Sequence, residues 1–200
     1  MIVAGLTGSI GMGKSVLASQ LRRLGVPVHA SDEAVHRLLA RGGAAVPAIR
    51  ALWPKTVENG AVDRKKLGVV VFSDPAARQR LESILHPLVR RESERFLREQ
   101  RRKGMKIAVL DIPLLYETGQ AGRFDHVICV TAPHFVQKRR VLSRKNMTED
   151  RFNTILKLQI PDAIKRARAD SVINTAHGYR GSLGTLKKVL KALSAAKTGA

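Results

Sequence analysis

The residues with the clearest chemical meaning lie near the N-terminus, in a glycine-rich octapeptide. Residues 8–15 read Gly-Ser-Ile-Gly-Met-Gly-Lys-Ser and match the pattern G-x-x-x-x-G-K-[ST]. Glycines at this spacing let consecutive backbone N–H groups turn inward and surround phosphate oxygens. In such a loop Lys14 reaches the β- and γ-phosphates of a nucleotide, and the hydroxyl of Ser15 is a ligand for Mg²⁺. The octapeptide therefore predicts a nucleotide-phosphate site.

The sequence around the octapeptide favours this interpretation over a chance glycine-rich turn. An apolar run, residues 2–6, precedes it, and residues 14–24 follow with Leu17, Leu21 and Leu24 on one helical face. Strand, loop and helix in this order form the arrangement that the pattern requires. The N-terminus of such a helix also brings the positive end of its dipole to the phosphates.

Two carboxylates follow predicted strands and could take part in phosphoryl transfer. Asp32 comes directly after residues 26–30, at the edge where α/β sheets bind ligands, and is a candidate general base for an acceptor hydroxyl. A helix N-cap is an equally good interpretation of Asp32. Asp111 ends the apolar run 106–111, where a carboxylate can orient a metal ion, although a cap or turn residue fits the same position.

Positive charge is dense in the C-terminal third of the chain. Residues 138–168 hold ten Lys or Arg and three acids, which is typical of a lid over a phosphate chain. Arg140 and Arg144 lie at i and i+4, so on a helix they share one face and could clamp a phosphate. For most of the ten residues a solvated helical face is the simpler explanation.

Five apolar segments of strand length alternate with helical or loop sequence, which predicts one α/β domain around a parallel five-stranded sheet. These segments are residues 2–6, 26–30, 106–111, 126–131 and 171–174. Helices are predicted over 14–24, from 31 onward, and over 133–145, 148–159, 161–168 and 182–195. The expected fold is a P-loop NTPase fold like that of nucleoside monophosphate kinases, with helices flanking the sheet.

Residues 42–103 contain no further convincing buried strand, and this stretch is predicted to be mostly helical. Helices are expected to start at Asp63 and at Asp74-Pro75, and His86-Pro87 is expected to break or kink the last of them. The predicted single domain then has three parts: a core of about 1–31, 105–137 and 170–200, a helical substrate-binding lobe of about 32–104, and a lid of about 138–169.

Composition limits the function classes further. The chain has 200 residues, with 36 Lys and Arg against 16 Asp and Glu, a net charge of +20, and 44% hydrophobic residues. A folded domain that faces an anionic partner is therefore expected.

The single cysteine, Cys129, excludes an intramolecular disulfide and a cysteine-based zinc site. No leader sequence and no apolar run near the roughly 20 residues of a membrane span is found, so a cytoplasmic protein without a membrane partner is expected.

Among nucleotide-binding proteins, a small phosphotransferase fits these features best. Leu114 occupies the glycine position of a switch motif that would begin at Asp111, and there is no Asn-Lys-x-Asp motif, so a switch GTPase is disfavoured. A nucleoside or nucleotide monophosphate kinase is the nearest alternative. A basic nucleic-acid-binding NTPase is less favoured, because an aromatic content of 4% is sparse for base stacking.

These motifs together resemble the dephospho-CoA kinase family over nearly the whole chain. Besides the phosphate loop, the resemblance rests on Ser31-Asp32, Leu85-His86-Pro87-Leu88 and Asp111-Ile112-Pro113-Leu114-Leu115-Tyr116-Glu117. It continues with Gln137-x-x-Arg140-Val141-x-x-Arg144, Gln159, and Lys165-Arg166-Ala167-Arg168-Ala169-Asp170 before Val172-Ile173-Asn174.

The resemblance implies ATP-dependent, Mg²⁺-assisted phosphorylation of the ribose 3′-hydroxyl of dephospho-CoA, the final step of coenzyme A biosynthesis. It assigns catalytic roles to Lys14, Asp32, Arg140 and Arg144, and a metal contact to Ser15, beside which Asp111 stays the metal candidate by its position. It assigns ATP contacts to Gly8, Gly11, Met12, Gly13, Lys14, Ser15 and Val16. It assigns substrate contacts to Thr7, Asp32, His86, Pro87, Leu114, Leu115 and Glu117. No specific nucleic-acid partner is expected, and the protein is expected to be a monomer or a small homo-oligomer.

The sequence departs from the family pattern at three positions. Ser9 stands where glycine is common, Val16 stands where threonine usually follows Ser15, and Thr175 stands where asparagine is frequent. Val16 lacks a hydroxyl that could contact the α-phosphate, but its backbone N–H is retained. Thr175 changes the side chain expected on the adenine side.

Overall fold

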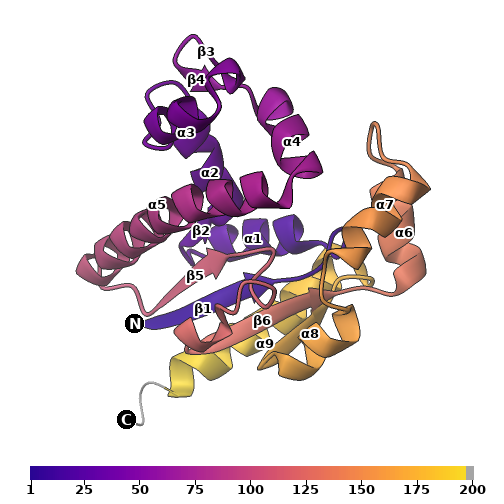
Figure 1. Ribbon diagram of the computed structural model, residues 1–200. Coiled ribbons are helices and arrows are strands. Elements are labelled where there is room, and N and C mark those ends of the chain that lie inside the picture. Colours follow the sequence, from indigo (N-terminus) through magenta and orange to yellow (C-terminus); the bar gives the residue numbers. More distant parts are fainter. Residues whose placement is uncertain (197–200) are drawn as a thin grey trace. The chain divides into compact units, whose positions relative to one another are not determined.

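Five strands form one parallel sheet in the order β2–β5–β1–β6–β7 (Figure 1). The computed structural model describes residues 1–196. The strands are β1 (Ile2–Thr7), β2 (Val28–Ala30), β5 (Ile107–Asp111), β6 (His126–Thr131) and β7 (Ser171–Asn174). This arrangement confirms the predicted α/β fold.

Strand register places the ends of β1 and β5 next to each other. The two strands pair in parallel, with Ile2 opposite Ile107 and Leu6 opposite Asp111. β1 also pairs with β6, and all five residues of β5 and the last five of β1 are buried. Near-continuous apolar runs are what a parallel sheet covered on both faces requires. The loop that follows β1 therefore starts beside the carboxylate that ends β5.

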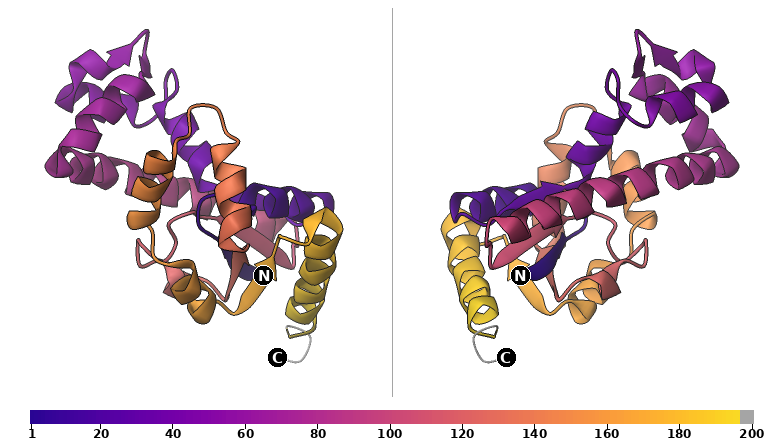
Figure 2. Two further views of the ribbon diagram at one scale, coloured as in Figure 1. Left: turned by 90° about the vertical axis from the view of Figure 1, so that its right-hand side faces the viewer. Right: turned by 90° about the vertical axis from the view of Figure 1, so that its left-hand side faces the viewer.

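Two helices, α1 (Lys14–Arg23) and α9 (Gly178–Ala196), lie side by side against one face of the sheet (Figure 2). They bury a core with side chains from β1, β5, β6 and β7; its fully enclosed members include Leu6, Leu17, Leu21, Ile128, Ile173 and Leu186. The opposite face is covered by α8 (Asp162–Arg168) and by the chain between β5 and β6, which contains the short helix η2 (Ala121–Arg123). A Cβ on Gly5 would lie 2.6 Å from Leu115 Cδ1, which shows how closely that chain packs on the sheet.

Two short helices follow β6, namely α6 (His134–Leu142) and α7 (Glu149–Lys157). The N-cap of α7 is Thr148, whose hydroxyl accepts a hydrogen bond from the Arg151 N–H, as its position predicts. The prediction that α6 continues to residue 145 is wrong. The helix ends at Leu142 because the next residues form a turn in which Asn146 adopts a left-handed φ of 62°.

The segment between β2 and β5 is mostly helical and contains one hairpin. Its elements are α2 (Ser31–Leu39), α3 (Val46–Leu52), η1 (Pro54–Thr56), β3 (Val57–Glu58), β4 (Ala61–Val62), α4 (Arg64–Ser73) and α5 (Pro75–Arg102). The antiparallel β3–β4 hairpin was not predicted. Asn59 and Gly60 both have positive φ, 49° and 78°, as a two-residue hairpin turn requires. The Asn-Gly pair is the sequence signal that identifies such a turn.

Helix α5 runs without interruption through Pro87, so the predicted break at His86-Pro87 is absent. A proline inside a helix removes one backbone hydrogen bond and crowds the preceding turn. Apolar side chains on both sides of Pro87 pack against the core formed with α2, α3 and α4, and this packing holds both halves in helical geometry; they are Leu81, Ile84, Leu85, Leu88 and Val89. The predicted helix starts are confirmed, since Asp63 caps α4 and Pro75 begins α5.

The chain divides into two compact units, each with its own internal packing. One contains Met1–His29 and Gln100–Ala200, and the other contains Ala30–Glu99. The division into core, substrate-binding lobe and lid stays a prediction. Within residues 1–196, no helix has both the length and the apolar character needed to cross a bilayer.

Replacing Pro87 by alanine is expected to stabilise the protein. The substitution restores a backbone N–H inside a continuous helix, and the exposed ring contributes little packing. We expect the free energy of unfolding to rise by about 1–2 kcal/mol, less than the roughly 3 kcal/mol cost of an internal proline because the unfolded chain also gains freedom. Urea denaturation followed by circular dichroism measures the change.

The matched control is Glu82→Ala, a substitution at an exposed position of the same helix five residues earlier. A Pro87→Ala protein that is less stable than the control would show that the proline ring itself supports the native packing.

Candidate active site

The octapeptide forms the loop between β1 and α1 and the first residues of α1. Several of its backbone N–H groups make no hydrogen bond in the described part of the chain. Gly11 and Gly13 adopt positive φ angles of 77° and 91°. Within residues 1–196, the backbone N–H groups of Gly11, Gly13, Lys14 and Ser15 donate to no other group. Uncommitted N–H groups at the start of a helix, together with its dipole, form a binding site for an anion.

The two glycines are required by close contacts as well as by their backbone angles. A Cβ on Gly11 would lie 2.5 Å from Val141 Cγ2, because α6 packs directly on the loop. A Cβ on Gly13 would lie 2.9 Å from Thr175 Oγ1, in the segment that follows β7. Any larger residue at either position would push the loop away from the elements that support it.

Lys14 and Asp111 form an ion pair at the mouth of the loop. The distance from Lys14 Nζ to Asp111 Oδ1 is 2.5 Å, and the two side chains are 16% and 9% exposed. The pairing of β1 with β5 brings them together, since Leu6 lies opposite Asp111. The contact holds the Lys14 ammonium group next to Asp111, where a phosphate could replace the carboxylate as its partner. Ser15 and Val16, at the start of α1, are both exposed.

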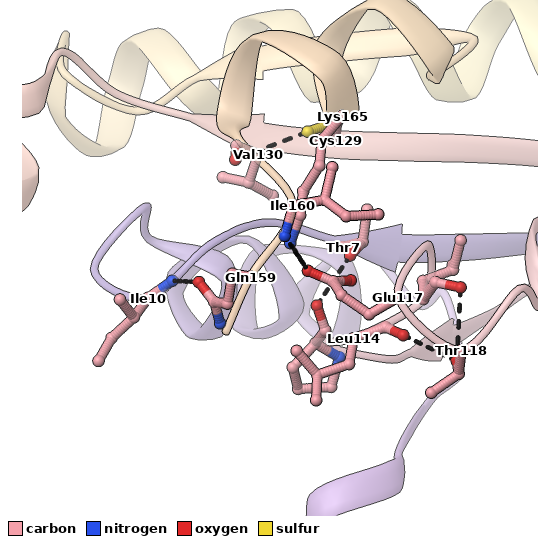
Figure 3. A network of polar contacts seen from close by, with 12 residues as sticks. Thr7, Ile10, Leu114, Glu117, Thr118, Cys129, Val130, Gln159, Ile160 and Lys165 are labelled. Carbon is pink, nitrogen blue, oxygen red and sulfur yellow. Dashed lines mark hydrogen bonds and ion pairs between the residues drawn. The ribbon is translucent and has the colours of Figure 1, made fainter. Parts of the chain in front are cut away.

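Thr7 is buried and binds the chain that follows β5. Its hydroxyl donates a hydrogen bond to the Pro113 carbonyl at 3.1 Å (Figure 3). Leu115, in the same stretch, is buried beneath Gly5, whereas Leu114 is 41% exposed. Of these three predicted substrate residues, only Leu114 presents its side chain to solvent.

Glu117 is engaged by two groups from the C-terminal part of the chain. Its Oε1 accepts a hydrogen bond from the Ile160 N–H at 3.0 Å and lies 2.7 Å from Lys165 Nζ (Figure 3). Lys165 is fully buried and Glu117 is 12% exposed, so this is a sheltered ion pair. A buried lysine is rare unless it is paired. The role of Lys165 was not predicted, although the residue lies in one of the motifs that carry the family resemblance.

Two glutamines bind the backbone of Ile10, inside the loop. Gln137 Nε2 donates to the Ile10 carbonyl at 2.8 Å. Gln159 Oε1 accepts from the Ile10 N–H at 3.1 Å (Figure 3). Gln137 lies on α6 and Gln159 follows α7. Neither residue was assigned a role from the sequence, because an uncharged amide carries no chemical signal until its partner is known.

The two lid arginines occupy different surroundings. Arg140 donates to the Thr175 hydroxyl at 2.8 Å and to the Thr175 carbonyl at 2.9 Å, and the Thr175 hydroxyl donates to the Met12 carbonyl at 2.7 Å. Arg144 lies beyond the end of α6, is exposed, and has no side-chain hydrogen bond or ion pair among the described residues. The predicted i, i+4 arrangement on one helix face is therefore wrong, since the helix ends between the two arginines.

Three of the predicted site residues belong to the other unit, residues 30–99. Asp32 is exposed and is the second residue of α2, whose N-cap is Ala30. The N-cap interpretation of Asp32 is therefore wrong. His86 and Pro87 are exposed on α5. The remaining predicted site residues lie in the unit that contains the phosphate loop.

Two titratable groups, one in β6 and one in the chain after β5, are kept uncharged by their surroundings. Burial, and then the nearby charge of Asp162, raises the pKa of the Cys129 thiol to about 12. Burial likewise raises the pKa of the Tyr116 hydroxyl to about 12. Both groups stay protonated at neutral pH, so neither can act there as a base or nucleophile.

Comparison with known proteins finds close similarity to one family of kinases. The family model for dephospho-CoA kinase matches residues 1–180. A dephospho-CoA kinase from Mesorhizobium japonicum is 52% identical over 193 residues, which cover 96% of this chain and 97% of that protein. One from Paramagnetospirillum magneticum is 52% identical over 200 residues, covering 100% and 94%. Among solved structures, TT1252 from Thermus thermophilus has 35% identity and a TM-score of 0.84 over 96% of both chains.

The Cys129 thiol is expected to resist modification in the native protein. At pH 8 a thiol with a pKa of about 12 has almost no reactive thiolate, and the side chain is buried. We expect a thiol reagent such as DTNB to label the folded protein at least a hundredfold more slowly than the same protein in urea. Rapid labelling of one thiol per folded chain would contradict the burial of Cys129.

Proposed function

The chain belongs to the dephospho-CoA kinase family, and from that premise we propose that its residues transfer the γ-phosphoryl group of ATP to the ribose 3′-hydroxyl of dephospho-CoA. The activity of the chain is the dephospho-CoA kinase activity that defines the family, which is the final step of coenzyme A biosynthesis. The observation that carries the assignment of the site is the row of four uncommitted N–H groups beside Lys14 and Asp111. Together they form a preorganised cradle for a polyphosphate.

On the donor side, the loop binds and orients the phosphates of ATP. The N–H groups of Gly11, Gly13, Lys14 and Ser15 would donate to phosphate oxygens without first breaking any hydrogen bond of the chain. Lys14 would exchange its partner Asp111 for the β- and γ-phosphates. The ion pair already holds the lysine at the loop, so this exchange needs only a short movement of its ammonium group. Preorganised donors of this kind stabilise the charge of a transferring phosphoryl group.

The Ser15 hydroxyl and the Asp111 carboxylate are oxygen donors of the kind that Mg²⁺ prefers. Within residues 1–196, no group of three or more His, Cys, Asp or Glu side chains could hold a metal alone. In phosphoryl-transfer sites Mg²⁺ is usually held by one or two protein oxygens and by substrate phosphates. When bound, Mg²⁺ neutralises charge on the phosphates. We assign its protein contacts to Ser15 and Asp111.

On the acceptor side, Asp32 is the proposed general base. It would accept the proton of the ribose 3′-hydroxyl as that oxygen attacks the γ-phosphorus. Its side chain is exposed, and a negative charge is favoured in the first turn of a helix by the helix dipole. We assign direct substrate contacts to the exposed residues His86, Pro87 and Leu114.

The remaining predicted substrate residues are assigned a supporting role. Thr7 and Leu115 are buried, and Glu117 binds Ile160 and Lys165. These contacts support a function in shaping the stretch from Asp111 to Glu117, beside the phosphate loop.

The two arginines are assigned different roles. Arg144 is an exposed cation without a partner in the described chain, which supports a contact with the transferred phosphoryl group. Arg140 binds Thr175, and Thr175 binds the Met12 carbonyl of the phosphate loop. These hydrogen bonds support a role for Arg140 in holding the phosphate loop in place. We also propose that the enzyme is cytoplasmic and acts as a monomer or a small homo-oligomer.

The acceptor is tested by measuring ADP release with a panel of hydroxyl compounds. Dephospho-CoA, AMP, CMP and shikimate are supplied separately with Mg²⁺ and ATP in a coupled assay. We expect kcat/KM for dephospho-CoA to exceed that for each other acceptor by at least about a hundredfold, since acceptors that lack groups the site is built to bind leave its contacts unmade in the transition state. Comparable turnover of AMP or CMP would instead indicate a nucleotide kinase.

The proposed base is tested with Asp32→Asn. The substitution keeps the shape of the side chain but removes its capacity to accept a proton, so kcat is expected to fall by about 10²–10⁴-fold. The KM for ATP is expected to change little, because the phosphate loop is intact. Steady-state kinetics and the melting temperature are measured together.

Glu33→Gln, which neutralises the adjacent exposed residue of α2, serves as the matched control. Turnover by Asp32→Asn within a few-fold of that of the control would remove Asp32 as the base.

A further inference from the structure

Both backbone groups of Ile10 are bound by glutamine side chains. The Gln137 amide nitrogen binds the Ile10 carbonyl at 2.8 Å, and the Gln159 amide oxygen binds the Ile10 N–H at 3.1 Å. The partners dictate which end of each amide faces the loop, because a carbonyl can only accept and an N–H can only donate. Gln137 therefore acts as a donor, and Gln159 acts as an acceptor.

The hydrogen bond from Gln137 also fixes a donor of the phosphate loop. The Ile10 carbonyl and the Gly11 N–H belong to one peptide group, and no peptide bond among the described residues is cis. A trans peptide is planar, so its N–H points opposite to its carbonyl. Holding the carbonyl on α6 therefore aims the Gly11 N–H away from α6. That N–H is one of the uncommitted donors of the loop.

The surroundings hold both glutamines in place. Gln137 is 3% exposed, and its backbone carbonyl would lie 3.1 Å from a Cβ on Gly11, so α6 packs tightly against the loop. The residue after Gln159 is Ile160, whose N–H binds Glu117, and Glu117 pairs with the buried Lys165. These contacts hold the backbone of both glutamines close to the loop.

We propose that Gln137 and Gln159 are positioning residues for nucleotide binding. Gln137 presents the Gly11 N–H to a phosphate oxygen, and Gln159 prevents the preceding peptide from rotating out of place. Gln137 lies in α6, and Gln159 follows α7. Their hydrogen bonds to Ile10 therefore link the position of the α6–α7 segment to the conformation of the phosphate loop. The inference rests on the proposed function only in taking ATP as the nucleotide.

The experiment compares two kinds of substitution at each position. Gln137→Met and Gln159→Met keep the length of the side chain and remove its hydrogen bond. Gln137→Glu and Gln159→Glu add the same negative charge near the phosphates but differ in hydrogen bonding, because a carboxylate can accept from the Ile10 N–H but cannot donate to the Ile10 carbonyl.

Binding of Mg²⁺-ATP is measured by equilibrium dialysis without acceptor. We expect each methionine variant to raise the Kd about fivefold to tenfold, the effect of one lost hydrogen bond. We expect Gln137→Glu to raise the Kd at least fivefold more than Gln159→Glu, since the shared charge effect cancels in this comparison. Gln120→Met is the control, because within the part of the chain that the structure describes the side-chain hydrogen bonds of Gln120 join it only to Thr118 and Arg123.

Steady-state kinetics distinguish positioning from a general loss of folded protein. We expect the KM for ATP to rise in parallel with the Kd, while the KM for dephospho-CoA stays within about twofold of the wild-type value. A purely structural role would lower the apparent kcat and leave both KM values unchanged. Wild-type ATP affinity in both methionine variants would overturn the proposal, as would equal effects of the two glutamate variants.

The outcome does not depend on which acceptor the enzyme uses. If the wild-type protein failed to phosphorylate dephospho-CoA, the proposed function would be wrong, but the ATP-binding comparison would still decide the role of the glutamines. If Gln137→Glu did not fold, as its burial makes possible, the two methionine variants alone would decide the question.

Discussion

A backbone that keeps four N–H groups without partners at the start of a helix must be held open by the structure around it. In this protein the loop between β1 and α1 is supported by α6 at Gly11, by Thr175 at Met12 and Gly13, by two glutamines at Ile10, and by the Lys14–Asp111 ion pair. These supports come from separate parts of the chain. Because the donors are fixed before a nucleotide arrives, little reorganisation is required on binding.

The ion pair between Glu117 and Lys165 extends this support to the other side of the sheet. Taking both charges out of water is costly, so the pair is a poor source of stability by itself. It orients Glu117, which then binds the Ile160 N–H next to Gln159. The pair therefore has its main effect on geometry, and neutralising one partner alone would leave a buried charge without compensation.

Sequence patterns were sufficient for the sheet and the phosphate loop, but not for the contacts that position them. The strands β6 and β7 have the predicted bounds because apolar runs are local signals. The end of α6 was missed because it depends on the left-handed conformation of Asn146. The contacts of Glu117 and Gln159 were also missed. They join residues 43 and 149 positions apart, and no local pattern records such pairs.

The two glutamines tie both sides of the α6–α7 segment to one point, because residues 137 and 159 bind the same loop residue. The chain between them is therefore a closed loop. The entropic free-energy cost of closing a flexible loop grows only with the logarithm of the loop length. Each doubling of the length adds about 0.6 kcal/mol to this cost. Insertions in the exposed turn after Leu142 are thus inexpensive, whereas a shift of either glutamine along the chain breaks the closure. Length variation among related kinases should concentrate at that turn.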